Sequence, residues 1–262
     1  MPELPEVNTV TKMFRQTVLG KRIAKVIVYD SKILRNQTAE QFVDTCAKHH
    51  FVDTYRHGKY FFGELDSGLH ILFHLGMTGD LIYYLDEMER PRHTRFEIYF
   101  ADGMILGYDD LRKFSRILVL SDRTDYIKKI GLGPDALRIR ESQFIKLFAG
   151  RNAPVKSLLM NQKLMAGVGN LYADEVCYQA RIHPASRAGG LDHLDIVELY
   201  HKMKSILKLA CRRNAYYKIY PEDWFWEWRK AGTEIPGVGK VKKMKVGGRS
   251  TYYVESLQKR VI

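Results

Sequence analysis

The chain has 262 residues, with 42 Lys and Arg against 30 Asp and Glu, a formal net charge of +12 and a pI near 9.5. This length allows one large domain or two smaller domains, each with its own core. The charge is typical of proteins that bind a polyanion, usually nucleic acid or an anionic membrane surface, and it excludes neither.

Two further features of the composition exclude other classes. No run of residues is apolar enough to span a bilayer, and the N-terminus lacks the apolar core of a signal peptide, so we expect a soluble, intracellular protein. Cys46, Cys177 and Cys211 are odd in number, far apart and outside any CxxC pair. This argues against a disulfide framework and against a cysteine zinc site.

Hydrophobic periodicity divides the chain into a β-rich half and a helical half. Val7, Val10, Phe14 and Val18 have helical spacing, which predicts a helix over 3–19 that ends at Gly20. Residues 22–120 are read as short strands punctuated by Gly and Asp, which favours a β-sandwich. Examples of such strand signals are 23–28, 59–62, 69–73, 96–100 and 104–108.

The spacing of hydrophobic residues changes from strand-like to helical after about residue 121. Residues 132–135 (LGPD) are interpreted as a linker, and 236–262 as a Gly- and Lys-rich β-hairpin. We therefore expect an α+β protein: an N-terminal helix with a β-sandwich domain (1–131), a helical domain (132–235) and a terminal hairpin (236–262), with a cleft between the first two. Helices are predicted at 141–150, 154–160, 171–181 and 190–213.

The first six residues, MPELPE, carry a possible nucleophile. Removal of Met1 would leave Pro2 with a free secondary amine, which attacks an aldehyde-level carbon to give an iminium. Glu3 and Glu6 lie beside it at the predicted helix start, where negative charge is favoured. Taken alone, however, Pro and acidic residues are an ordinary helix-start signal.

Four later motifs also have ordinary structural interpretations. HGKY (57–60) reads as a solvated Lys on a turn, and HLGMTG (74–79) as a strand end with a core Met. YDDLRKF (108–114) reads as a charged turn with one buried aromatic residue. GVGN (167–170) joins two predicted helices, and a helix that begins there would expose N–H groups suited to an anion.

Taken together and in this order, MPELPE and the four motifs resemble the formamidopyrimidine-DNA glycosylase / endonuclease VIII family over nearly the whole chain. The resemblance implies a bifunctional DNA glycosylase and AP lyase that excises oxidised bases through a Schiff base on Pro2 and cuts the strand by β- and δ-elimination. It implies no metal or organic cofactor. The catalytic residues implied are Pro2, Glu3, Glu6, Lys59 and Arg249.

The resemblance also assigns DNA contacts. Met77, Arg112 and Phe114 would fill the gap left by a flipped nucleotide and wedge the stack, a set closer to the formamidopyrimidine branch than to the endonuclease VIII branch. The helix–two-turn–helix around GVGN would place Asn170 on a phosphate near Lys59. The implied DNA-binding residues are His74, Met77, His93, Arg112, Phe114, Arg151, Lys156, Asn170 and Tyr172.

The C-terminal hairpin departs from the zinc finger of many relatives. Alignment on residues 248–253 places Glu234, Gly237, Val254 and Leu257 at the four ligand positions, and only Glu could bind zinc. We therefore expect a zincless finger held by packing, with Arg249 on a phosphate. The ordinary alternative is a surface Arg in a basic tail.

A second departure is the aromatic segment 220–228, where the formamidopyrimidine branch has a longer Gly-containing loop that holds oxidised purines. This leaves 8-oxoguanine, formamidopyrimidines, hydantoins and oxidised pyrimidines all open as substrates. We expect a monomer that acts on damaged double-stranded DNA inside the cell and binds no membrane. Two alternatives stay open: a non-catalytic DNA-damage-binding module of the same fold, and a general architectural or RNA-binding protein.

Overall fold

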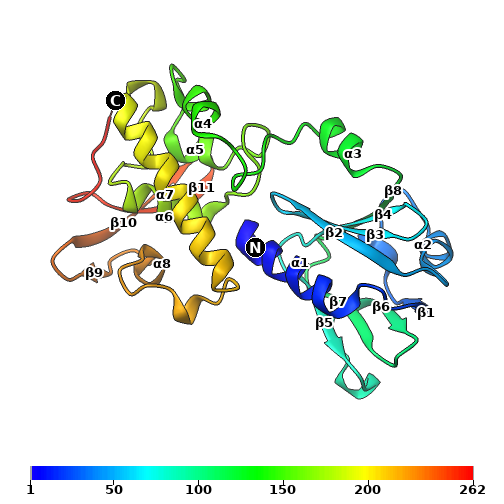
Figure 1. Cartoon of the computed structure of the whole chain (residues 1–262). Coiled ribbons are helices and arrows are strands. Elements are labelled where there is room, and N and C mark those ends of the chain that lie inside the picture. Colours follow the sequence, from blue (N-terminus) through cyan, green and yellow to red (C-terminus); the bar gives the residue numbers. More distant parts are fainter. Residues whose placement is uncertain (1, 262) are drawn as a thin grey trace. The chain divides into compact units, whose positions relative to one another are not determined.

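The computed structural model describes residues 2–261, which divide into two compact units (Figure 1). The N-terminal unit comprises Pro2 and residues 6–131, and the C-terminal unit comprises residues 3–5 and 132–261. None of the helices in 2–261 combines the length and apolar character needed to cross a membrane.

The N-terminal unit is a β-sandwich with helices against its core. Its two four-stranded antiparallel sheets have the orders β1-β6-β7-β5 and β2-β3-β4-β8. Phe73 and Tyr108 stack across the two sheets, with ring centroids 6.3 Å apart. The elements are α1 (Leu4–Val18), β1 (Ile23–Val28), α2 (Ala39–Cys46), β2 (Phe51–His57), β3 (Tyr60–Leu65), β4 (His70–His74), β5 (Gly79–Tyr84), β6 (Thr94–Phe100), β7 (Ile105–Asp110), β8 (Arg116–Leu120) and α3 (Arg123–Lys129).

Helix α1 forms where its periodicity predicts. Val7, Phe14 and Val18 are fully buried, and Phe14 packs edge-on against Phe51 at 4.8 Å. Gly20 ends the helix with φ +77°, a conformation that L side chains rarely adopt. The prediction of a helix over 3–19 is confirmed to within one residue at each end.

One helix of this unit was missed by the strand interpretation of 22–120. Helix α2 begins with a capping box, in which the Thr38 hydroxyl accepts from the Gln41 N–H and the Gln41 side chain accepts from the Thr38 N–H. Thr-x-x-Gln is a known helix-start signal, so the sequence contained the information. Phe42 and Cys46 bury the inner face of this helix.

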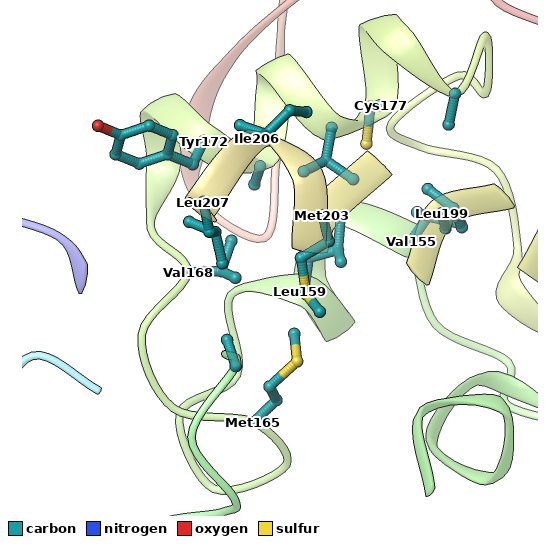
Figure 2. Packing of buried hydrophobic residues seen from close by; sticks show 14 of the residues in the cluster. Val155, Leu159, Met165, Val168, Tyr172, Cys177, Leu199, Met203, Ile206 and Leu207 are labelled. Carbon is teal, nitrogen blue, oxygen red and sulfur yellow. The ribbon is translucent and has the colours of Figure 1, made fainter. Parts of the chain in front are cut away.

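The C-terminal unit is helical and ends in a small antiparallel sheet. Buried side chains of α5, α6 and α7, among them Val155, Cys177 and Met203, meet in one apolar cluster (Figure 2). The sheet has the order β11-β10-β9. The elements are α4 (Glu141–Phe148), α5 (Val155–Leu159), α6 (Asn170–Gln179), α7 (His193–Arg212), α8 (Phe225–Trp228), β9 (Glu234–Ile235), β10 (Gly239–Val246) and β11 (Arg249–Val254).

The α+β class, the four helices predicted beyond residue 140 and the terminal hairpin are therefore confirmed. Residues 132–135, interpreted as a linker, follow directly after the point in the chain where the two units divide, and their backbone is hydrogen-bonded within the C-terminal unit. The Gly133 N–H donates to Gln162 O, the Ala166 N–H donates to Pro134 O, and Asp135 is 2% exposed. A short Gly-Pro segment can be a fixed part of a packed loop, and here it joins the loop between α5 and α6.

Candidate active site and nucleic-acid contacts

The N-terminal residues are fixed within the C-terminal unit through Glu3. The Glu3 carboxylate is 4% exposed and accepts hydrogen bonds from the Leu171 N–H (2.8 Å) and the Tyr172 N–H (3.4 Å), in the first turn of α6. The Leu4 N–H donates to Gly167 O at 3.1 Å. Since chain termini are usually loose unless tied down, these contacts mark Glu3 and Leu4 as a positioned segment.

This arrangement corrects one expectation about GVGN. We expected the N–H groups at this helix start to be exposed for a phosphate, but two of them hold the protein's own carboxylate. The anion at the positive end of α6 is therefore Glu3. Asn170 retains a buried Oδ1 without a hydrogen-bond partner among residues 2–261, and its use as a phosphate contact stays a prediction.

The close approach of Glu3 depends on the absence of a side chain at Gly169. A Cβ built there would lie 2.3 Å from Glu3 Cδ and 2.6 Å from Glu3 Oε1. With Glu3 in the catalytic role that the resemblance implies, we expect Gly169→Ala to displace the carboxylate and to lower strand cleavage about 10²-fold, since misplacing a catalytic group by about 1 Å costs that much. The measurement is single-turnover cleavage of an abasic duplex.

The matched control for this change is Gly20→Ala, because a Cβ at Gly20 meets no atom within 4 Å. Gly20→Ala makes the same chemical change as Gly169→Ala, but its only structural effect is local backbone strain. Its cleavage rate should therefore equal that of the wild type. An unaffected rate in Gly169→Ala would show that the observed position of Glu3 is not needed for the reaction.

Two loops of the N-terminal unit bring the predicted intercalating residues together. Met77 is 38% exposed and Phe114 is 51% exposed, and the Arg112 guanidinium lies over the Phe114 ring at 4.7 Å. Gly76 allows the loops to touch, because a Cβ there would lie 2.5 Å from the Phe114 carbonyl carbon. Exposed apolar side chains on glycine-dependent loops are suited to enter a base stack.

Asp110, which the sequence analysis did not single out, organises these two loops. It is fully buried, and its carboxylate accepts from the Thr78 hydroxyl (2.5 Å), the Ser115 N–H (3.0 Å) and the Arg112 N–H (3.2 Å). Burial raises the pKa of Asp110, but hydrogen bonds led by those of Thr78 and Ser115 outweigh burial and lower the pKa below its usual value. A buried carboxylate with several local donors is a tertiary feature that YDDLRKF alone does not reveal.

We expect Asp110→Asn to destabilise the N-terminal unit by about 1–3 kcal/mol at pH 7, through the loss of charge-assisted hydrogen bonds. Because the folded pKa is lowered, the stabilisation is present above the unfolded pKa and is lost as pH falls through the folded pKa. Urea unfolding of wild type and variant should therefore converge at low pH. Asp125→Asn, at an exposed site of α3, is the control and should leave stability unchanged. An equal difference in unfolding free energy between wild type and Asp110→Asn at every pH would contradict a stabilising role for the ionised Asp110.

Lys59 lies on a turn at the end of the second sheet, close enough to His74 of β4 for its charge to act on the imidazole. Gly58 and Lys59 form the two-residue turn between β2 and β3, with His57 paired to Tyr60. Burial, together with the charges of Arg116 and Lys59, lowers the pKa of His74 to about 4. The imidazole is therefore neutral at pH 7, and its Nδ1 accepts from the Gly76 N–H at 3.3 Å. This leaves Nε2 as the N–H donor.

His93 is hydrogen-bonded to the last two residues of β7, directly before the loop that carries Arg112. Its N–H donates to Asp109 Oδ1 at 2.8 Å, and its carbonyl accepts from the Asp110 N–H at 3.1 Å. The N-terminal unit thus gathers His74, Met77, His93, Arg112 and Phe114 on adjoining strand ends and loops. Their roles on DNA remain predictions.

Two of the predicted DNA contacts need correction, because their side chains are fully buried. The Lys156 ammonium lies 2.7 Å from Asp174 Oδ1 and donates to Thr251 Oγ1, so it cannot reach a phosphate. The Tyr172 hydroxyl pairs with the Tyr220 hydroxyl at 2.8 Å, and its N–H faces Glu3. Both residues build the C-terminal unit and carry no surface for DNA.

The remaining predicted residues are accessible. Arg249 is exposed and follows the Gly247-Gly248 turn at the tip of the β10–β11 hairpin, where both glycines have positive φ. Arg151 is exposed and lines a surface pocket with Arg187, a second cation that the sequence analysis missed. Glu6 lies half-buried in the first turn of α1.

The hairpin does not offer a zinc site. Val254 is fully buried in an apolar cluster with Ile235, Val241 and Phe225, and Leu257 packs against it. Within residues 2–261 no group of three or more His, Cys, Asp or Glu side chains is placed to hold a metal ion. The donor set does not fit zinc, and apolar packing holds the hairpin at these positions.

Three residues of the aromatic segment 220–228 belong to the core: Tyr220, Trp224 and Phe225. Trp224 and Phe225 are buried, and Glu175 accepts from the N–H groups of Phe225 and Trp226 at the start of α8. Burial raises the pKa of Glu175 to about 7. The segment packs against α6 and is folded into the C-terminal unit.

Comparison with known proteins agrees with this architecture. Family models for the formamidopyrimidine-DNA glycosylase N-terminal domain and H2TH domain match residues 1–117 and 130–218. A formamidopyrimidine-DNA glycosylase of Pelotomaculum thermopropionicum is 35% identical over 99% of both chains, and one of Arabidopsis thaliana is 31% identical over 99% of this chain and 71% of its own.

Solved structures of a relative extend the comparison to the fold. The Lactococcus lactis formamidopyrimidine-DNA glycosylase, solved with DNA that contains an AP site, superposes with a TM-score of 0.90 at 26% identity, over 99% of this chain and 100% of that one. A single-residue variant of the same enzyme, in complex with DNA that contains Fapy-dG, superposes with a TM-score of 0.89 and covers 99% of this chain and 100% of that one. The chain belongs to the formamidopyrimidine-DNA glycosylase family.

Proposed function

We propose that the protein is a bifunctional DNA glycosylase and AP lyase that acts on damaged DNA, with Pro2 as the nucleophile. Family membership supports the activity. The observation that carries the residue assignment is the fixed position of Glu3, buried at the start of α6 and bonded covalently to Pro2. A nucleophilic amine beside a positioned carboxylate is the pairing that Schiff-base chemistry needs.

The proposed reaction begins when the Pro2 nitrogen donates its lone pair to C1′ of the damaged nucleotide. The base leaves with the electrons of the glycosidic bond. The C1′–O4′ bond then breaks and gives an iminium, and Glu3 transfers the proton that the Pro2 nitrogen loses to the sugar oxygen O4′. Loss of a C2′ proton expels the 3′ phosphate, and loss of a C4′ proton then expels the 5′ phosphate. Water hydrolyses the iminium and frees Pro2.

Other residues act on the nucleic acid. We assign Lys59 and Arg249 to the leaving phosphates, with His74, His93, Arg151 and Asn170 on the backbone and Glu6 as a brace for the N-terminal segment. Met77, Arg112 and Phe114 replace the flipped nucleotide, which offsets part of the few kcal/mol that flipping costs. Backbone contacts by a chain of charge +12 give affinity that is largely independent of sequence.

The test is borohydride trapping on a panel of duplexes that carry an abasic site, a formamidopyrimidine, 8-oxoguanine, a hydantoin or an oxidised pyrimidine. We expect a covalent complex and β,δ-cleavage with the abasic duplex, and the panel then ranks the lesions. A non-catalytic damage-binding module would bind these duplexes without trapping. An architectural or RNA-binding protein would show no preference for lesion duplex over plain duplex at matched salt.

We further propose that the protein acts inside the cell as a monomer, with damaged double-stranded DNA as its partner and no membrane. Light scattering on the purified protein, alone and with one equivalent of lesion duplex, tests the monomer. A mass of two chains per duplex would contradict it.

A further inference from the structure

A buried ion cluster joins α5, α6 and the segment after α8. Lys156 and Asp174 are both fully buried, with Nζ and Oδ1 2.7 Å apart. Arg229 Nε donates to Asp174 Oδ2 at 2.8 Å. Two cations therefore share one carboxylate in the interior of the C-terminal unit.

The same cluster holds strand β11 at three successive residues. Lys156 Nζ donates to Ser250 O at 3.2 Å and to Thr251 Oγ1 at 2.8 Å. The Tyr252 N–H donates to Asp174 Oδ2 at 3.3 Å, and the Arg229 guanidinium lies over the Tyr252 ring at 4.8 Å. These residues follow directly after Arg249, and Thr251 Oγ1 also donates to Arg249 O at 3.1 Å.

The other end of this connection is Glu3. Its carboxylate is held by the N–H groups of Leu171 and Tyr172, and Asp174 follows Tyr172 by two residues in the same helix. Two residues of α-helix span about 3 Å along the axis. The carboxylate beside the nucleophile and the strand that begins at Arg249 are thus fixed to the same turn of α6.

Stability is a weak explanation for such a cluster. The cost of removing two cations and a carboxylate from water often equals or exceeds their mutual attraction, and well-packed apolar residues can replace buried ions without loss. Buried ionic groups instead fix a register in some proteins, because only one arrangement satisfies every charge. Here the register that is fixed is that of β11 against α6.

We propose that Lys156, Asp174 and Arg229 are positioning residues that hold Arg249 at a set place relative to Glu3. The inference rests on the proposed function of Glu3 and Arg249. It also gives Lys156 a role despite its burial: it acts on DNA through the hairpin strand.

The test is a double-mutant cycle between the cluster and Arg249. Asp174→Asn and Thr251→Val are each made alone and together with Arg249→Ala, and affinity is measured for a duplex with a tetrahydrofuran abasic analogue over a range of salt. Thr251→Val is the milder change, because it removes one link to the strand and keeps the three charges. Glu198→Gln, an exposed acid on α7, is the matched control and should bind as the wild type does.

We expect Arg249→Ala to weaken binding about tenfold and to lower the slope of log K against log salt by about 0.9, as for one lost phosphate contact. Asp174→Asn should reproduce both effects, and Thr251→Val should do so to a smaller extent. In the Arg249→Ala background neither change should weaken binding further, because residues that act through one contact are not additive.

The inference would be overturned if Asp174→Asn and Thr251→Val weakened binding equally in the wild-type and Arg249→Ala backgrounds. Unchanged affinity in both of these single variants would also overturn it. If Asp174→Asn does not fold, Thr251→Val decides the outcome alone. Failure of the proposed function gives a different result, since the wild type would then show no borohydride-trapped complex with abasic duplex. If the wild type forms the trapped complex but the effects in the double-mutant cycle are additive, only the positioning role is refuted.

Discussion

Protein whose Pro2 nitrogen is blocked, by a retained Met1 or by an N-terminal tag, should bind abasic duplex and yet form no covalent complex with it under borohydride. The reason is that an amide nitrogen has no available lone pair, whereas the secondary amine of a free Pro2 reaches an iminium directly. Pro2→Gly keeps a primary amine but loses the ring that fixes it. We expect its cleavage rate to fall by at least about 10³-fold, short of the ~10⁶-fold that follows complete loss of a nucleophile.

The measurement is trapping and single-turnover cleavage, with binding to a tetrahydrofuran duplex as the control for folding. Mass spectrometry of the active protein should show that Pro2 is its first residue. Fully active protein that still carries Met1 would refute Pro2 as the nucleophile.

Glu3→Gln should retain the fold and DNA affinity while losing most of the catalytic rate. The Gln carbonyl oxygen can still accept from the Leu171 N–H, which makes the shorter of the two hydrogen bonds to Glu3, and only the longer one from the Tyr172 N–H is lost. It cannot move a proton, and general acid–base catalysis of this kind contributes about 10²–10⁴-fold. We expect kcat to fall by that factor, with the Kd for tetrahydrofuran duplex within about threefold of wild type, the change of roughly 0.6 kcal/mol that a neutral substitution allows.

Glu198→Gln repeats the same chemical change at an exposed position of the C-terminal unit and should cleave normally. Normal cleavage by Glu3→Gln would show that Glu3 is only an N-terminal anchor for α6. Together with Gly169→Ala, this separates the charge of Glu3 from its position.

Much of the molecule could be predicted because the relevant signals are local. Helix α1 follows from the spacing of Val7, Phe14 and Val18, and the β10–β11 hairpin follows from Gly247-Gly248 between strand-forming runs. Helix α2 was equally local, through its Thr38 and Gln41 capping box, and was overlooked because its surroundings are rich in strand signals.

The predicted site residues that lie on turns are exposed or partly exposed, whereas Lys156 and Tyr172, on helices, are buried in the core. Met77, Arg112, Phe114 and Arg249 occupy exposed turns or loop ends. The burial of Lys156 could not be predicted, because a charged residue is expected at the surface unless it has a buried partner. That partner is Asp174, which is 18 positions away in the chain.

The sequence by itself indicated the family, the α+β class and the lack of a four-ligand zinc set in the hairpin, since each depends on residue identity or short-range spacing. Only the tertiary structure decided which anion occupies the start of α6, which carboxylate orders the Met77 and Phe114 loops, and that Lys156 serves the hairpin strand. These depend on burial and on partners distant in the chain, where desolvation forces each polar group to find its match, and no local pattern encodes that pairing.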